Sequence, residues 1–263
     1  MYQRIERSNK RAERHSKVIE LVEQQRLLMP RLGTRKLYYN LKDIFMDQQL
    51  KTGRDQLFDI LRHSNMLIKP RKNYTKTTHS KHWLRKYPNL FATAKINGSN
   101  QAYVSDITYI KSRERTHYLS LVTDAFSRKI VGYHLSDDMS TEEVVKALKQ
   151  ATKNNILNDK IIHHSDRGLQ YCSSLYQKEL QRNGIVPSMT DGYDCYQNAL
   201  AERVNGILKN EFLIHKCNTG KELKKYISES IWVYNNVRPH LSLNMKTPNE
   251  IHKKSSKNLI SLL

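Results

Sequence analysis

The sequence predicts an α/β protein in which a mixed five-stranded sheet flanked by helices follows a small all-α domain. Two patterns predict this fold class. Apolar residues recur at helical spacing over residues 17–66, and from residue 102 onward short strand-like runs alternate with helical ones. A polar, basic stretch separates the two patterns. We therefore expect a helical domain over residues 1–68, a basic linker over 69–98 and an α/β domain over 99–263.

The charge of the chain narrows the class of partner. The 263 residues include 45 Lys and Arg against 25 Asp and Glu, which gives a net charge of +20 and an isoelectric point of about 9.8. In the first hundred residues, 22 side chains are basic and 8 are acidic. So uneven a surplus favours a nucleic acid over an anionic membrane surface, and we expect double-stranded DNA as the partner.

The cysteines and the hydropathy indicate the compartment. Cys172, Cys195 and Cys217 form no C-x-x-C pair, and any disulfide scheme leaves one thiol over, as is typical of a reduced compartment. No apolar run is long enough to cross a bilayer, and no apolar segment follows the charged N-terminus. We expect a cytoplasmic, nucleoid-associated protein without a membrane partner.

The N-terminal region predicts helices. Residues 1–16 are polar and basic, which indicates an exposed helix or a frayed end. Three short helices with breaks near Pro30 and Gly53 are expected over 17–66, an arrangement that resembles a helix-turn-helix module. The alternative is a small helical bundle whose basic residues are only solvated. Residues of the last helix that a helix-turn-helix would present to DNA are Arg54, Gln56 and Arg62.

Residues 69–87 lack an apolar period and predict a linker. The stretch contains no acid, and the rings of Tyr74, Trp83 and Tyr87 lie between its basic side chains. Such a segment can follow a phosphate backbone and stack on unpaired bases, although an exposed linker without specific contacts is the alternative. The basic residues that we expect to contact DNA are Lys69, Arg71, Lys72, Lys76, Lys81, Arg85 and Lys86.

The C-terminal region alternates strands and helices. The expected elements in order are strands 102–111, 117–123 and 129–135, a helix from 140 to 151, a strand at 160–164, a helix at 173–183, a short strand at 185–187, a loop at 190–196, and helices at 197–210 and 223–232. The first three strands are spaced as a meander. Pro187 lacks an amide hydrogen, so its strand is expected at an edge or very short.

Three carboxylates occupy places from which they can meet. Asp106 lies in the first strand, Asp166 follows the fourth, and Glu202 lies on a helix 35 residues further on. On that helix Leu200, Val204 and Ile207 share an apolar side expected to pack on the sheet. The opposite side, expected to face outward, carries Asn198, Glu202, Asn205 and Lys209. The acids that turn contexts predict as caps or solvated groups are Asp124, Asp137, Asp138, Asp191 and Asp194.

The chemistry of such a set indicates a metal site. Three carboxylates brought together repel one another unless a cation neutralises them or some take up protons. Oxygen ligands with open positions suit Mg²⁺ or Mn²⁺, and two such ions can activate a nucleophile and stabilise the leaving oxygen at phosphorus. Of the adjacent His163 and His164, which point to opposite faces of a strand, we expect one to be buried and one to shape the site.

These residues resemble the integrase catalytic core of DDE transposases. The matching runs are YVSDITYI, TDAFSRKIVGYHLS, HSDRGLQYCS, YQNALAERVNGILKNEF and YNNVRPHLSLNMKTPNEIH. The resemblance implies a ribonuclease H-like fold, with Asp106, Asp166 and Glu202 as catalytic ligands of two metal ions. It implies hydrolysis at the ends of a mobile element, then attack of a 3′-hydroxyl on target DNA without a covalent enzyme intermediate. It also implies that Lys209, with Arg203 and Asn205 on the same helix, contacts DNA.

The sequence departs from the family pattern in several ways. Tyr103 stands where the family usually has Trp, and the large aromatic ring is expected to pack equally well. No Cys precedes Cys172, which excludes the zinc domain of retroviral integrases. Related enzymes often take a further DNA-binding segment from an upstream reading frame, so a partner or fusion of that kind is expected. Synapsis of two element ends implies a dimer or a higher oligomer.

Two other functions remain open. One is a DNA-binding protein whose core is catalytically silent, although retention of all three acids argues against it. The other is a nuclease of the ribonuclease H-like class, which would need neither the basic linker nor the helical N-terminal region. Tyrosine recombination would require an Arg-rich catalytic set that the sequence does not contain.

Overall fold

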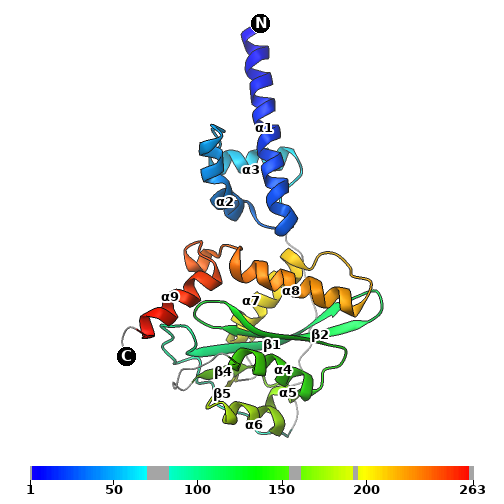
Figure 1. Cartoon of the computed structure of the whole chain (residues 1–263), viewed down its shortest axis with the longest axis vertical. Helices are drawn as coiled ribbons and strands as arrows, with labels where there is room; N and C mark the ends of the chain where they lie inside the picture. Colours follow the sequence, from blue (N-terminus) through cyan, green and yellow to red (C-terminus); the bar gives the residue numbers. More distant parts are fainter. Residues whose placement is uncertain (1, 70–82, 154–160, 192–194, 261–263) are drawn as a thin grey trace.

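The chain folds into two stacked parts (Figure 1). A computed structural model describes residues 2–69, 83–153, 161–191 and 195–260. The N-terminal helices stand on the side of the α/β part that carries helices α8 (Gly220–Asn236) and α9 (Pro248–Ile260). In the part of the chain described here, no helix is long and apolar enough to cross a membrane.

The N-terminal part is all-helical, with α1 (Tyr2–Leu28), α2 (Thr34–Asp47) and α3 (Arg54–His63). Of the two alternatives for the polar N-terminus, the exposed helix is present, and residues 2–16 run directly into the helix that carries the apolar stripe. No Gly or Pro interrupts the helix, and ion pairs between Lys10 and Glu6 and between Lys17 and Glu13 support its exposed half. The fully buried residues that hold the three helices together are Val18, Val22, Leu32, Leu37, Leu57 and Leu61.

The sheet has five strands in the order β3-β2-β1-β4-β5. Antiparallel pairs join β1 (Ala102–Lys111) to β2 (Thr116–Asp124) and β2 to β3 (Ile130–Ser136). Parallel pairs join β1 to β4 (Ile162–Ser165) and β4 to β5 (Val186–Met189). The predicted fold class is therefore confirmed, and Pro187 lies on the edge strand, as expected.

Helices cover both faces of the sheet. One face packs on α4 (Thr141–Thr152), α5 (Leu169–Cys172) and α6 (Ser174–Arg182). The other packs on α7 (Ala199–Ile207) and α8. Strand β3 packs tightly against α4 at Gly132, where a Cβ atom would lie 2.1 Å from the carbonyl oxygen of Ala147. Short helical turns at Cys195–Asn198 and Leu241–Leu243 join the longer elements.

The helix expected at 197–210 is shorter and changes geometry. Helix α7 ends at Ile207, and a π-helical turn, η2 (Leu208–Phe212), continues it. A turn of this kind inserts an extra residue and redirects the side chains that follow. As a result, Lys209 and Glu211 do not continue the regular face of α7.

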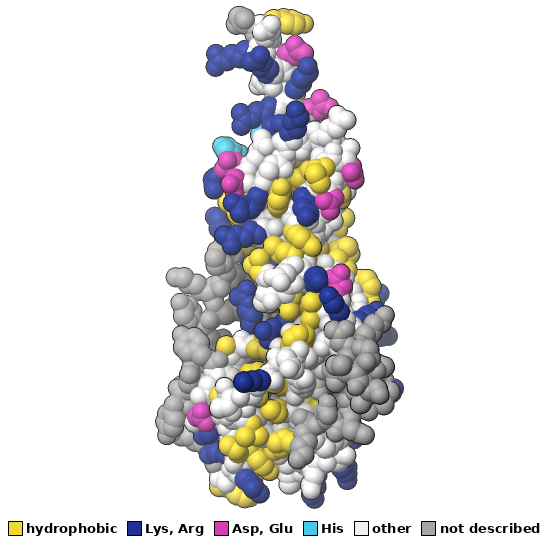
Figure 2. Space-filling model, turned by 90° about the vertical axis from the view of Figure 1, so that its left-hand side faces the viewer, with side chains coloured by type: hydrophobic (Ala, Val, Ile, Leu, Met, Phe, Trp, Pro, Cys, Tyr) yellow, Lys and Arg dark blue, Asp and Glu magenta, His cyan; other side chains and the backbone are white. Residues whose placement is uncertain are grey.

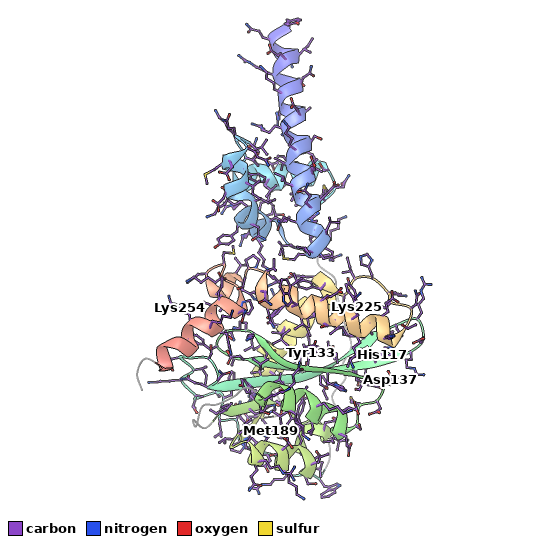
Figure 3. All side chains as sticks on the ribbon, viewed as in Figure 1. His117, Tyr133, Asp137, Met189, Lys225 and Lys254 are labelled. Carbon is purple, nitrogen blue, oxygen red and sulfur yellow. The ribbon has the colours of Figure 1, made fainter. Side chains whose placement is uncertain are left out.

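Polar side chains of β2 and β3 form contacts at the end of the sheet where β2 begins and β3 ends, and with helix α8 (Figure 3). His117 Nδ1 lies 2.7 Å from Asp137 Oδ1, and the Tyr133 hydroxyl donates to Ser228 Oγ on α8 at 3.1 Å. Gly220 begins α8 beside His117, where a Cβ would lie 2.8 Å from the ring. The position of α8 against the meander is therefore set by side-chain contacts as well as by its apolar face.

Candidate active site

Asp106 lies in the middle of β1 and on the face of the sheet that α7 covers. Its neighbours on that face, Ala102 and Val104, belong to a small apolar cluster with Ala201 of α7. The carboxylate accepts two hydrogen bonds, from the Asn205 side-chain amide to Oδ2 at 2.7 Å and from the Ile107 backbone to Oδ1 at 2.9 Å. Both bonds hold the carboxylate in a fixed orientation.

Asp166 follows β4 directly and begins the turn that leads to α5. Its Oδ1 accepts a hydrogen bond from the Gly168 amide at 3.0 Å, which closes the turn. A Cβ atom at Gly168 would lie 3.0 Å from the same oxygen, so the turn favours glycine there. Because β1 and β4 are parallel neighbours, with Val104 opposite His164, the chain brings Asp166 beside Asp106.

Glu202 comes from the first turn of α7, and its side chain is exposed. The start of that helix is fixed to β1, because the buried amide of Asn198 donates to the Ser105 carbonyl at 3.1 Å. An acid in the first turn is favoured by the helix dipole. Glu202 thus stands at the edge of the site on an anchored helix.

The three acids influence one another electrostatically. Burial raises the pKa of Asp106 to about 7, and the charges of Asp166 and, more weakly, Glu202 raise it too, against the hydrogen bonds from Asn205 and Ile107. Burial and the charge of Asp166 also raise the pKa of Glu202. The charge of Asp166 thus reaches both of the other acids, as expected for carboxylates that lie near one another.

The acids are near one another but are not gathered into a finished metal site. Among the residues that the structure describes, no three His, Cys, Asp or Glu side chains lie close enough to hold one ion together. The donors themselves fit a hard cation, since all are carboxylate oxygens. The buried Oδ1 of Asn205, whose amide nitrogen donates to Asp106, also has no hydrogen-bond partner among the described residues.

The polar side of α7 does not face outward as predicted. Asn198 and Asn205 are each 5% exposed, and both donate to β1. The prediction was wrong because the polar side chains find their partners on the strand of Asp106, and periodicity cannot reveal such partners. Among the four residues expected on the outward side, only Glu202 is exposed. Asn205 is therefore a partner of Asp106 and not an exposed group.

Lys209 also turns towards β1. Its Nζ donates to Thr108 Oγ1 at 3.1 Å, two residues along the strand from Asp106. Burial lowers the pKa of Lys209, while the nearby Asp106 carboxylate acts in the opposite direction. The ammonium group thus lies at the margin of the site, and the DNA contact expected of it remains a prediction.

Both His163 and His164 are buried, which corrects the expectation that one of them would shape the site. Helices and loops cover β4 on both faces, so neither side of the strand is open. His163 Nε2 lies 2.8 Å from Ser105 Oγ and 2.9 Å from the Tyr176 hydroxyl. Burial lowers the pKa of His163 to about 3, which leaves this imidazole as a neutral part of the scaffold.

Two of the other acids, Asp124 and Asp138, act as caps, as the sequence predicts. Asp124 is fully buried and accepts from the Asn100 amide at 2.7 Å and from the Ser127 amide at 2.7 Å, so it closes the β2–β3 turn. Asp138 accepts from the Ser140 amide at 2.9 Å, just before α4. Asp194 lies outside the described residues.

The basic residues expected to meet DNA are placed as follows. Arg54 pairs with Asp55 at 2.9 Å, Arg62 pairs with Asp59, and all four side chains are exposed on α3. Arg203 of α7 is exposed, as are Lys69, Arg85 and Lys86. Figure 2 shows Lys and Arg side chains spread over the N-terminal helices and continuing onto the core. The expected contacts that lie outside the described residues are Arg71, Lys72, Lys76 and Lys81.

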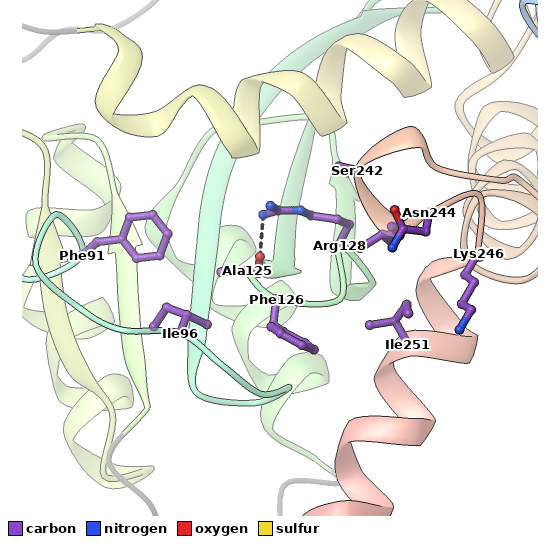
Figure 4. Close-up of a pocket in the computed structure, with 10 residues that line it drawn as sticks. Phe91, Ile96, Ala125, Phe126, Arg128, Ser242, Asn244, Lys246 and Ile251 are labelled. Atoms are coloured by element: carbon purple, nitrogen blue, oxygen red, sulfur yellow. Dashed lines mark hydrogen bonds between the residues drawn. The ribbon is translucent and has the colours of Figure 1, made fainter. Parts of the chain in front are cut away.

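A cavity of about 470 Å³ lies away from the acids, between the 91–96 segment, the β2–β3 turn and residues 242–251 (Figure 4). None of Asp106, Asp166 and Glu202 lines it. A small-molecule enzyme usually places its reacting groups in such a cavity. Here the carboxylates lie outside the cavity and beside a basic surface, an arrangement that suits an extended anionic polymer better than a small molecule.

Comparisons with known proteins identify the α/β part of the chain as an integrase core domain. Two families described as integrase core domains match residues 97–195 and 183–248. In structure, the chain is similar to a chain of a simian T-cell lymphotropic virus intasome, with a TM-score of 0.51 and 19% identity over 84% of this chain and 70% of that one. That likeness concerns the fold alone.

Relatives from bacteria narrow the family. The chain is 35% identical over 187 residues to a transposase for the insertion sequence element IS904 of Lactococcus lactis, covering 67% of this chain and 73% of that protein. It is 34% identical over 225 residues to an uncharacterised 31 kDa protein of the insertion element IS600 of Shigella sonnei, covering 84% and 81%. This chain belongs to the family of insertion-sequence transposases with an integrase core domain, which confirms the resemblance found in its sequence.

Proposed function

We propose that the chain catalyses both chemical steps of transposition, hydrolysis of phosphodiesters at the ends of its element and transfer of the 3′-hydroxyl into target DNA. The observation that supports this best is that three acids from three separate elements lie near one another: besides burial, the charge of Asp166 raises the pKa of Asp106, to about 7, and that of Glu202. Carboxylates so arranged cost stability unless they serve a charged ligand. Family membership supplies the class of reaction.

Asp106, Asp166 and Glu202 would hold Mg²⁺ or Mn²⁺, as two ions. When bound, such ions activate an oxygen nucleophile and stabilise the leaving oxygen in an in-line displacement at phosphorus. Asp106 and Asp166 are each oriented by hydrogen bonds to the chain. Glu202 is exposed, so in this proposal its side chain reorients towards the two aspartates and completes the ligand set when DNA and metal arrive.

The other residues near the site would bind and orient the substrate. Lys209 lies beside Asp106 and would exchange its hydrogen bond with Thr108 for a DNA phosphate. Arg203, exposed next to Glu202, would contact the backbone on the outer side. Because the side chains of Lys209 and Arg203 do not contact the reacting oxygen in this proposal, replacing them should weaken DNA binding more than it slows the cleavage and joining steps.

The N-terminal helices would bind the double-stranded DNA of the element ends. The surplus of basic residues in the first hundred positions supports this, because phosphate neutralisation dominates affinity for DNA. Helix α3, with exposed Arg54 and Arg62, would be the recognition helix of a helix-turn-helix. Two ends must be joined together, which requires a dimer or higher oligomer, with or without a further DNA-binding segment from an upstream frame.

The direct test combines the protein with the genomic DNA that flanks its gene, in Mg²⁺, and scores cleavage and joining separately. Glu202→Gln should lose both activities by about 100-fold or more, since losing even an outer-shell partner of a metal costs about 10–100-fold. Glu142→Gln, an exposed acid on α4, is the matched control and should stay active. Cleavage without joining would indicate a nuclease, and binding with neither activity a silent DNA-binding protein.

A further inference from the structure

The N-terminal helices meet the core at a seam where the carboxylate of Glu211, in η2, faces them. The Arg31 amide donates to the Glu211 carbonyl at 3.3 Å, and Lys36 Nζ of α2 lies 3.7 Å from Glu211 Oε1. Figure 1 places the ends of α1 and α2 on this side of the core. Glu211 therefore faces basic groups from both parts of the chain.

Glu211 already has a full partner within the core. Arg238, which is 1% exposed, donates from Nε to Oε2 and from Nη2 to Oε1, both at 2.8 Å. Such a two-point pairing uses both oxygens and is the strongest form of this contact. Lys36 is left at 3.7 Å, which is beyond the length of a hydrogen bond.

The seam consequently holds more positive charge than Glu211 neutralises. Burial lowers the pKa of Lys36 to about 8, and the charges of Arg238 and Arg203 lower it further than Glu211 can offset. Burial and the charges of Arg238, Lys36, Arg128 and Arg203 lower the pKa of His240 to about 2. Glu211 is the one carboxylate among the charges that act on Lys36 in the described part of the chain.

A second group of unsatisfied donors lies at the end of α1. The Nε and Nη2 atoms of Arg26 and the Nε of Arg31 are buried, and among the described residues none has a hydrogen-bond partner. Arg31 Nη2 donates to the Lys69 carbonyl at 2.6 Å. Burial and the charge of Arg31 lower the pKa of Arg26. Buried guanidinium donors without acceptors are costly, and an anion would satisfy them.

We propose that this seam binds the phosphate backbone of duplex DNA through Arg26, Arg31, Lys36 and Arg203. The proposal rests on the proposed function and extends it, since it assigns a DNA contact to the junction itself. Arg203 directly follows Glu202, so a backbone held at the seam leads from the N-terminal helices to the catalytic acids. The ligand is a run of phosphodiesters, whose charge matches the surplus. Arg203 is exposed, and in this proposal the partly buried side chains of Arg26 and Lys36 turn towards the phosphate oxygens when DNA binds.

The competing explanation is structural, with Lys36 holding the two parts together through Glu211. The two explanations predict opposite effects of Lys36 on the stability of the folded protein. The pKa of Lys36 is lower in the folded protein than its ordinary 10.5, so the folded state binds this proton less well than the unfolded chain does. Below about pH 8 the charged Lys36 therefore costs stability, and the cost disappears as the pH rises from about 8 towards 10.5. Removal of a structural clamp would lower stability instead.

The test uses the full chain with Lys36→Met, Arg26→Gln and, as a control, Lys146→Met on α4, far from the seam. Affinity for the flanking DNA duplex is measured against salt in EDTA, so that no chemistry takes place. We expect each seam variant to flatten the slope of log affinity against log salt by about 0.9. The control should keep the wild-type slope, and free Lys36→Met should melt at or above the wild-type temperature at pH 7.

An unchanged slope for both seam variants overturns the proposal, whatever their melting temperatures. Flattened slopes that accompany a lowered melting temperature for Lys36→Met also overturn it, because they assign Lys36 to a clamp. The outcome is independent of the proposed chemistry. A wild-type protein that binds the duplex but neither cleaves nor joins it contradicts the catalytic proposal and leaves the seam measurement intact.

Discussion

The side-chain amide of Asn205 donates to Asp106 Oδ2 at 2.7 Å, which joins the helix of Glu202 to the strand of Asp106. Asn205 lies three residues after Glu202 and is buried, so the bond fixes one turn of α7 against β1. The relative position of the two acids, Asp106 and Glu202, thus depends on a residue that carries no charge.

Asn205→Ala should therefore act through Asp106. The buried carboxylate loses a hydrogen bond, which should destabilise the fold by about 1–3 kcal/mol. Metal affinity or activity should fall by about 10–100-fold, as for other outer-shell partners. Thermal unfolding and a Mg²⁺ titration of cleavage check both effects. Wild-type values in the two assays would show that the hydrogen bond does not position Asp106.

The raised pKa of Asp106 predicts how stability depends on pH and metal. Between about pH 4 and 7 the folded protein holds this proton while the unfolded chain releases it, so metal-free stability should fall as the pH rises through that window. Mg²⁺ should raise the melting temperature more at pH 8 than at pH 5. In Asp106→Asn both trends should diminish, and an unaltered metal response in that variant would contradict the assignment.

Replacement of glycine by alanine should have opposite effects on stability at two positions, Gly132 and Gly206. At Gly132 a Cβ atom would meet the Ala147 carbonyl oxygen at 2.1 Å, so Gly132→Ala should destabilise the protein by about 1–3 kcal/mol or more. At Gly206 of α7 the nearest atom recorded is Asn210 Nδ2 at 4.0 Å, and alanine should stabilise the helix by about 0.5–1 kcal/mol. Chemical denaturation measures both. Equal effects would mean that β3 does not pack tightly on α4.

Much of the fold could be predicted from the sequence because its signals are local. A short sequence pattern predicts each of three elements: an apolar run predicts the strand around Asp106, a glycine predicts the turn after Asp166, and an apolar stripe predicts the helix of Glu202. For residues 1–16 the sequence left an exposed helix and a frayed end as alternatives, and the helix is present, since polar residues can continue a helix without an apolar stripe. Burial of both His163 and His164 was missed because a central strand covered on both faces gives no alternation.

Contacts between distant residues were beyond the reach of sequence patterns. The side of α7 that carries Asn198, Asn205 and Lys209 looks like an exposed polar face until Ser105, Asp106 and Thr108 of β1 are placed opposite. The same holds for Lys36 and Glu211, which belong to different parts of the chain. The sequence did contain one useful signal, however. Asn side chains on the helix face that carries Glu202 are candidate hydrogen-bond partners for the acid on the strand opposite, as Asn205 is for Asp106.

The central claim is that a DNA 3′-hydroxyl, and no residue of the protein, attacks the target. The measurement that tests it compares a labelled flanking end that carries a 3′-hydroxyl with the same end carrying a 3′-deoxy terminus, each incubated with protein, Mg²⁺ and a target plasmid. We predict joined product from the hydroxyl end, none from the deoxy end, and no label attached to protein after denaturation. Joining of the deoxy end, or label covalently bound to the protein, would contradict the account.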